Sequence, residues 1–80
     1  MIWKTFKDEE TETYFYVAKQ TDNLIQYVCK VQKVILSDDY NLSIYSFDEK
    51  GDYALNFSEL SVNHQKLITK AEAYFKNERN

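Results

Sequence analysis

Short apolar runs alternate with polar clusters over most of the chain. Four of the runs are rich in β-branched and aromatic residues, a composition that favours strands over helices. In sequence order they are IWKTF at 2–6, TYFYVA at 13–18, LSIYSF at 42–47 and YALNF at 53–57. The polar clusters supply Asp, Asn, Ser and Thr, whose side chains form turns. They are KDEETE at 7–12, QTDN at 20–23, SDDYN at 37–41 and DEKGD at 48–52. The alternation predicts antiparallel strands joined by turns.

The strongest hairpin signal is the segment SFDEKGDYALNF at 46–57. It contains Gly51, the only glycine of a chain that has no proline. Because glycine adopts positive φ angles without a steric penalty, we expect Gly51 to occupy the positive-φ position of this turn.

The period of the apolar residues changes in the C-terminal part of the chain. From Leu60 onward they recur at Leu67, Ile68, Ala71, Tyr74 and Phe75. This i, i+3/i+4, i+7 spacing predicts an amphipathic helix, with Lys66 on its solvent side. Ser61 is the expected N-cap and Ser58 the alternative, because a serine hydroxyl accepts a hydrogen bond from a free N–H group of the first turn.

The stretch LIQYVCKVQKVIL at 24–36 fits two structures. A helix would gather its apolar residues into one stripe, and a weak repeat at a shift of 40 residues aligns Tyr27 and Val28 with Leu67 and Ile68. Its density of β-branched residues favours a strand, which is the interpretation we adopt. The sequence therefore predicts an α+β fold, a mostly antiparallel sheet of four to five strands packed by a C-terminal amphipathic helix. The alternative is a ββαββα pseudo-repeat in which residues 22–36 are helical.

Length and composition narrow the class of protein. Eighty residues, 44% of them hydrophobic, predict a single small globular domain over residues 1–80. The net charge of −3 provides no general attraction to phosphate, so direct nucleic-acid binding is not expected. We expect a cytoplasmic protein with no membrane partner, because no apolar run reaches the ~18 residues of a membrane span and the N-terminus lacks the apolar core of a signal peptide.

The residue types that carry chemistry are scarce. One cysteine, Cys29, and one histidine, His64, exclude the common zinc patterns, and a single glycine excludes phosphate-binding loops. The apolar neighbours of Cys29 predict a buried, inert thiol, and His64 is expected at the boundary of the helix. We therefore predict no catalytic, cofactor-binding or metal-binding residues, and a protein that is not an enzyme.

Two features predict a protein-binding surface. The acidic turn holds four carboxylates in five residues, and in an antiparallel meander it shares an edge with the turn near residue 38. Such an edge is complementary in charge to a basic surface on another protein. The strands are also apolar on both alternating sets of positions, so a single helix leaves aromatic surface exposed. The candidate partner-binding residues are Asp8, Glu9, Glu10, Glu12, Asp38, Asp39 and Trp3.

The functional expectation is a non-enzymatic binding module that acts through protein–protein interaction, with another protein or a second copy of itself as partner. Abundant Lys, Asn, Ile and Tyr indicate AT-rich coding, which fits a low-GC bacterium or one of its mobile elements. From this origin we expect a small inhibitor or accessory protein of a mobile element or phage. The alternatives are a toxin-immunity-like protein, an acidic nucleic-acid mimic, and a small enzyme or ligand-binding domain whose site forms in an oligomer.

Overall fold

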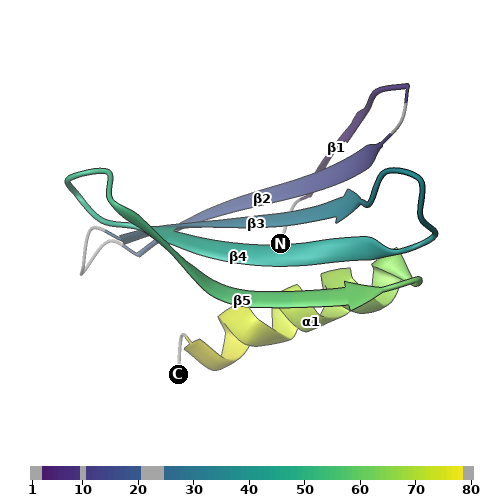
Figure 1. Cartoon of the computed structure of the whole chain (residues 1–80). Coiled ribbons are helices and arrows are strands. Elements are labelled where there is room, and N and C mark those ends of the chain that lie inside the picture. Colours follow the sequence, from purple (N-terminus) through teal and green to yellow (C-terminus); the bar gives the residue numbers. More distant parts are fainter. Residues whose placement is uncertain (1–2, 10, 21–24, 79–80) are drawn as a thin grey trace.

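A five-stranded antiparallel sheet with a helix packed against one face makes up the part of the chain that the structure describes (Figure 1). This computed structural model describes residues 3–9, 11–20 and 25–78, with side chains for 3–9, 11–17 and 26–75. The elements are β1 (Lys4–Lys7), β2 (Glu12–Gln20), β3 (Ile25–Lys33), β4 (Tyr40–Phe47), β5 (Tyr53–Ser61) and α1 (His64–Glu78). Each strand pairs with its neighbour in sequence, in the order β1-β2-β3-β4-β5. The α+β prediction is therefore confirmed.

The ambiguous stretch at 24–36 contains a strand, so the helical alternative over residues 22–36 and the pseudo-repeat are wrong. β3 pairs with β2 on one side and with β4 on the other. Alternation along β3 buries Cys29 and Val31 beneath the helix and turns Lys30 and Gln32 to the opposite face. Backbone pairing on both sides, together with the β-branched residues, outweighs the helical spacing. Leu24 lies outside the described residues.

The apolar end of the same stretch lies in a turn. β3 ends at Lys33, and the N–H of Val34 donates to the carbonyl of Asp39 across the turn at 2.9 Å. Leu36 adopts a φ of 60°, a left-handed conformation that costs a non-glycine residue about 1–2 kcal/mol. Ile35 and Leu36 are exposed, so their hydrophobicity does not reflect a place in the core.

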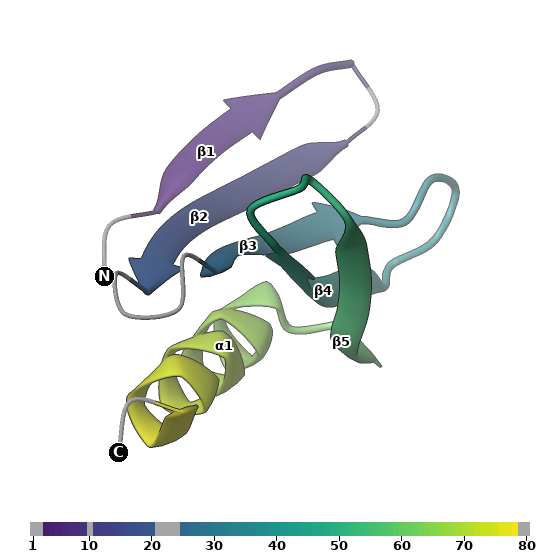
Figure 2. The ribbon, with the colours of Figure 1, turned by 90° about the vertical axis from the view of Figure 1, so that its left-hand side faces the viewer.

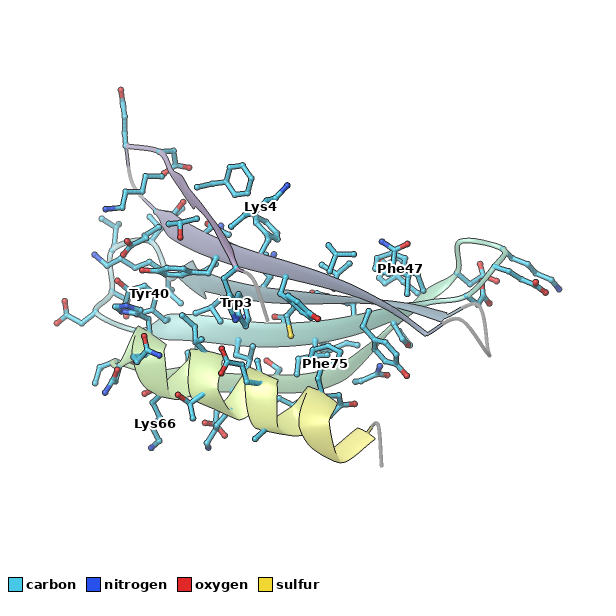
Figure 3. The ribbon with its side chains drawn as sticks, turned by 180° about the vertical axis from the view of Figure 1, so that it is seen from behind. Trp3, Lys4, Tyr40, Phe47, Lys66 and Phe75 are labelled. Carbon is cyan, nitrogen blue, oxygen red and sulfur yellow. The ribbon has the colours of Figure 1, made fainter. Side chains whose placement is uncertain are left out.

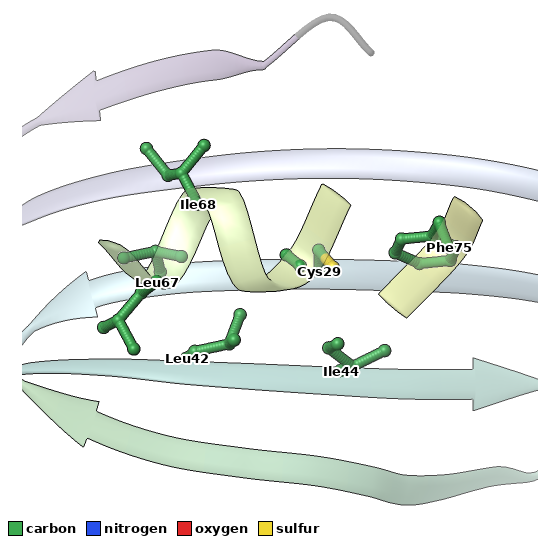
Figure 4. Packing of buried hydrophobic residues seen from close by; sticks show 8 residues of the cluster. Cys29, Leu42, Ile44, Leu67, Ile68 and Phe75 are labelled. Atoms are coloured by element: carbon green, nitrogen blue, oxygen red, sulfur yellow. The ribbon is translucent and has the colours of Figure 1, made fainter. Parts of the chain in front are cut away.

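The core lies between α1 and the middle of the sheet. Two rows of side chains cross the sheet here, one containing Val31 and Leu42 and the next containing Cys29 and Ile44. The predicted helix stripe packs onto them (Figure 4). Tyr74, a further residue of this stripe, is half-buried. The buried apolar residues are Cys29, Val31, Leu42, Ile44, Leu67, Ile68, Ala71 and Phe75. Burial of a large side chain of this kind stabilises the fold by about 1.5–3 kcal/mol.

The helix begins later than the sequence indicates. Asn63 is the N-cap, because its Oδ1 accepts hydrogen bonds from the N–H groups of Gln65 at 3.1 Å and Lys66 at 3.3 Å. The predicted caps, Ser61 and Ser58, are both wrong because they are strand residues of β5. Pairing with β4 continues through Ser61, so the chain has to turn before a helix can start. The Ser61 hydroxyl instead accepts the N–H of Asn63 at 3.1 Å.

The β4–β5 hairpin follows the prediction for its turn. Gly51 has a φ of 86°, and its N–H donates to the carbonyl of Asp48 at 3.0 Å. The side chain of Asp48 also accepts the N–H groups of Lys50 at 2.9 Å and Asp52 at 3.0 Å. One aspartate therefore organises the turn while the glycine supplies the positive φ.

A β-bulge interrupts the regular pairing of β5. Ile44 pairs with Phe57, whereas the next residue, Tyr45, pairs with Leu55, so Asn56 is the extra residue. The bulge accompanies the curvature of β5 across the sheet (Figure 1) and leaves a regular segment from Phe57 to Ser61.

Candidate interaction site

Two turns bring the predicted acidic residues to one end of the sheet, which we call the acidic end. In an antiparallel meander the turn after β1 and the turn after β3 lie at the same end. Lys33 lines a shallow depression with the first turn and a second one with the other turn. The acidic end contains Asp8, Glu9, Glu12, Asp38 and Asp39. Glu10 lies outside the described residues. The predicted arrangement is therefore present for the described carboxylates, while their partner-binding role stays a prediction.

The acidic end also carries two lysines that the sequence reasoning left out. The Nζ of Lys7 lies 3.4 Å from the Oε1 of Glu12, and Lys33 lines both depressions. Lys7 and Glu12 are opposite each other in the β1–β2 register, so strand pairing was the signal that would have indicated this pair. These cations offset part of the negative charge of this end.

Two of the aspartates shape their own turns. Asp8 Oδ1 accepts the N–H of Thr11 at 2.5 Å and its hydroxyl at 3.0 Å. Asp39 Oδ2 accepts the hydroxyl of Ser37 at 3.3 Å. Such hydrogen bonds are the usual reason for aspartate in turns. Glu9 and Asp38 are exposed at the same end, and they are the carboxylates best placed to meet a partner.

Glu12 belongs to a cluster of hydrogen-bonded and stacked side chains beside the start of α1. The hydroxyl of Tyr40 donates to Glu12 Oε2 at 3.2 Å. A hydrogen bond from the Tyr14 hydroxyl is the main cause that lowers the pKa of Glu12, with Lys7 and Tyr40 adding to it. Burial, together with the same carboxylate, raises the pKa of Tyr14 to about 12. The phenols are therefore held as donors to a carboxylate that stays ionised.

His64 completes this cluster through ring contacts. Its imidazole stacks on Tyr14 with ring centroids 5.2 Å apart and planes within 8°, and its centroid lies 5.1 Å from that of Tyr40. Cys29, the other candidate for chemistry, is completely buried, and burial raises the pKa of its thiol to about 12. A thiol in this state is a poor nucleophile near neutral pH. The arrangement serves packing and hydrogen bonding.

The face of the sheet opposite α1, which we call the open face, is not covered by any element of the described chain (Figure 2). Figure 3 shows Lys4 and Phe47 on this face, whereas Tyr40 and Phe75 lie on the side of the helix. Tyr53 and Val17 are 71% and 52% exposed. The apolar residues of the open face are Phe6, Phe15, Val17, Val28, Tyr45, Phe47, Tyr53, Leu55 and Leu60.

The charges on the open face differ in sign from the net charge of the chain. Among its described side chains the charged ones are Lys4 and Lys30, which flank Phe15 in one row across the sheet. The described carboxylates lie in the turns, on the side of the sheet that faces α1, or on α1 itself. The alternation of side chains along the strands could have indicated these lysines. Reading it requires knowing which set of alternating positions faces the helix.

Trp3 lies on the helix side of the sheet. Its Nε1 donates to Glu72 Oε1 at 3.2 Å, and its ring centroid is 5.9 Å from that of Tyr16. It therefore connects the N-terminal part of the sheet to α1. The structure does not bring Trp3 together with the acidic end or the open face, and its predicted role in partner binding remains a prediction.

Two further findings concern ligands and membranes. Within the described residues, no group of three or more His, Cys, Asp or Glu side chains is arranged to hold a metal ion. No helix in that part of the chain is long and apolar enough to cross a membrane.

Comparison with protein-family models, curated proteins and solved structures finds no match to this chain.

Proposed function

We propose that this protein is a non-enzymatic binding module that docks onto another protein through its open face. The observation that carries the proposal is the exposed apolar surface on the face of the sheet opposite α1, whereas the core lies on the other face. Contiguous exposed apolar side chains are the usual mark of an interaction surface, and tyrosine and phenylalanine are enriched at the centres of interfaces. Burying them against a partner would contribute about 25 cal/mol per Å² of apolar area.

The charge pattern supports a definite kind of partner surface. Lys4 and Lys30 on the open face suit carboxylates around an apolar patch, and the exposed Glu9 and Asp38 suit cations at its rim. We also propose that this protein is cytoplasmic and that it acts as a small inhibitor or accessory protein of a mobile element or phage. The free, buried thiol of Cys29 suits a reducing compartment such as the cytoplasm. The composition is typical of AT-rich coding, which supports an origin in a mobile element or phage.

Site-specific loss of a partner tests the proposal. A tagged wild-type chain would be incubated with a lysate of the organism of origin, in parallel with Val17→Asp and Tyr53→Asp on the open face. Lys66→Asp on the exposed side of α1 is the matched control, because it introduces the same side chain outside the open face. Circular dichroism and thermal unfolding would show that each variant is folded.

We expect a partner that wild type and Lys66→Asp retain and that both open-face variants lose. A partner retained equally by all four chains would overturn docking through the open face. The proposal would also be overturned if none of the four chains retained a partner.

A further inference from the structure

We propose that β5 pairs in antiparallel fashion with β5 of a second copy of this chain, so that the two sheets become continuous. The inference extends the proposed function, because a two-fold axis perpendicular to the sheet places both open faces on the same side. It rests, however, on the edge of β5 and not on the open face.

The two edges of the sheet are protected to very different degrees. Edge strands avoid unwanted pairing by being short and by carrying lysine. β1 has both devices, with four residues that include Lys4 and Lys7. β5 has nine residues and no lysine, and its single charged residue, Glu59, is paired with Lys70 of α1. The bulge at Asn56 is its one irregularity, and it leaves Phe57–Ser61 as a regular, uncovered segment.

The hairpin hydrogen bonds determine which backbone groups of β5 point outward. Val34 donates to the carbonyl of Asp39, and Asp48 donates to the carbonyl of Asp52. In an antiparallel ladder, residues alternate between pointing their N–H and C=O toward one neighbour and toward the other. Both hairpin bonds indicate that the even-numbered residues of β4 point their N–H and C=O groups toward β5.

The partners of these β4 residues in β5 are the odd-numbered ones, namely Phe57, Glu59 and Ser61. The N–H and C=O groups of Ser58 and Leu60 therefore face away from the sheet. In the part of the chain that the structure describes, no strand lies on that side. These groups are the donors and acceptors that a further strand would pair with.

The sequence of β5 is compatible with pairing to itself. A two-fold axis at Ser58 pairs Ser58 with its own copy and places Glu59 opposite Phe57, whereas an axis at Leu60 pairs Leu60 with its own copy and places Glu59 opposite Ser61. Like charges do not face each other in either register, although each chain carries a net charge of −3. Leu60, on the open face at this edge, would pack against the second copy.

Sedimentation equilibrium of the purified chain over a wide concentration range tests the inference. We expect a reversible monomer–dimer equilibrium. Leu60→Lys should weaken it by about tenfold or more, because an edge lysine opposes strand pairing. Phe6→Lys is the matched control, since Phe6 and Leu60 end the same row across the open face at opposite edges and are 55% and 61% exposed. Phe6→Lys should dimerise as wild type does.

Amide hydrogen exchange provides a readout that does not depend on a variant. The amides of Ser58 and Leu60 should exchange quickly in dilute protein and slowly in concentrated protein. The amide of Thr5, which points outward from β1 by the same alternation, should exchange at one rate throughout.

A chain that stays monomeric at all concentrations would overturn the inference, as would equal weakening by Leu60→Lys and Phe6→Lys. Because only the purified chain is used, such a result would leave docking of another protein on the open face untouched. Loss of that docking would in turn leave a measured dimer in place.

Discussion

Single residues of this chain owe their chemistry to their place in the sheet. Glu12 and Cys29 are both on the helix side, yet their pKa values move in opposite directions. Glu12 is surrounded by donors, namely two phenols and an ammonium group, and these favour its charged form. Cys29 is surrounded by apolar side chains, which disfavour the thiolate.

The reactivity of Cys29 is the prediction at this scale. A shift of the thiol pKa from 9.0 to about 12 lowers the thiolate fraction at neutral pH by about a thousandfold. Native protein should therefore react very slowly with a thiol reagent such as dithionitrobenzoate, and protein unfolded in urea should react at the rate of a free cysteine. Equal rates in the two states would show that Cys29 is accessible in the native chain.

At the scale of elements, the helix depends on a narrow stripe of contacts. α1 packs against β3, β4 and β5 but reaches β2 only through aromatic side chains such as Tyr16, whose ring lies 5.6 Å from that of Phe75. Leu67 is completely buried within the stripe, whereas the adjacent Lys66 is exposed. Neighbouring positions in one helix therefore differ in what they contribute.

Truncation of these two neighbours gives the prediction for the helix. Leu67→Ala should lower the free energy of unfolding by about 2–4 kcal/mol, because it removes buried methyl groups and leaves a cavity. Lys66→Ala should change the free energy by less than about 0.5 kcal/mol, as an exposed substitution does. Denaturant midpoints with unchanged slopes would measure both. If the two midpoints moved equally, the orientation of the helix would be incorrect.

The whole molecule separates its charges. Carboxylates gather at the turns at both ends of the sheet, while the described charges of the open face are lysines. The open face lies between the acidic end and the turn at 48–52, so a partner docked on it would meet carboxylates at both ends. Charges at a rim act mainly on the rate of encounter, and salt screens them.

Neutralising the exposed carboxylates of the acidic end should slow association with the partner captured through the open face. Glu9→Gln combined with Asp38→Asn is the informative variant, because Asp8 and Glu12 are engaged in structural hydrogen bonds. We expect an on-rate that is several-fold lower at low salt and equal to wild type at high salt, with a smaller change in the off-rate.

The control for this experiment neutralises two carboxylates at the opposite end, Glu49→Gln with Asp52→Asn. Both double variants have the same net charge, so a difference between them reports position. Stopped-flow or surface-binding kinetics at two salt concentrations would measure it. Identical effects of the two double variants would show that the acidic end contributes no more to association than the carboxylates of the 48–52 turn.

The candidate site was predictable in part. The sequence places Asp8 and Asp38 at one end of the sheet, because consecutive antiparallel strands return to the same edge. It did not indicate that Lys30 marks the open face. That position depends on which side of a strand a residue occupies, and a shift of one residue in register exchanges the two sides.

The sequence by itself determined the features that depend on local period and propensity. The stripe containing Leu67, the turn at Gly51 and the burial of Cys29 all follow from neighbours within a few residues along the chain. Only the tertiary structure decided that Ile25–Lys33 is a strand and that Asn63 caps the helix, because pairing with β4 governs both. Strand pairing joins residues that are distant in sequence, and its free energy overrides a local pattern that fits a helix equally well.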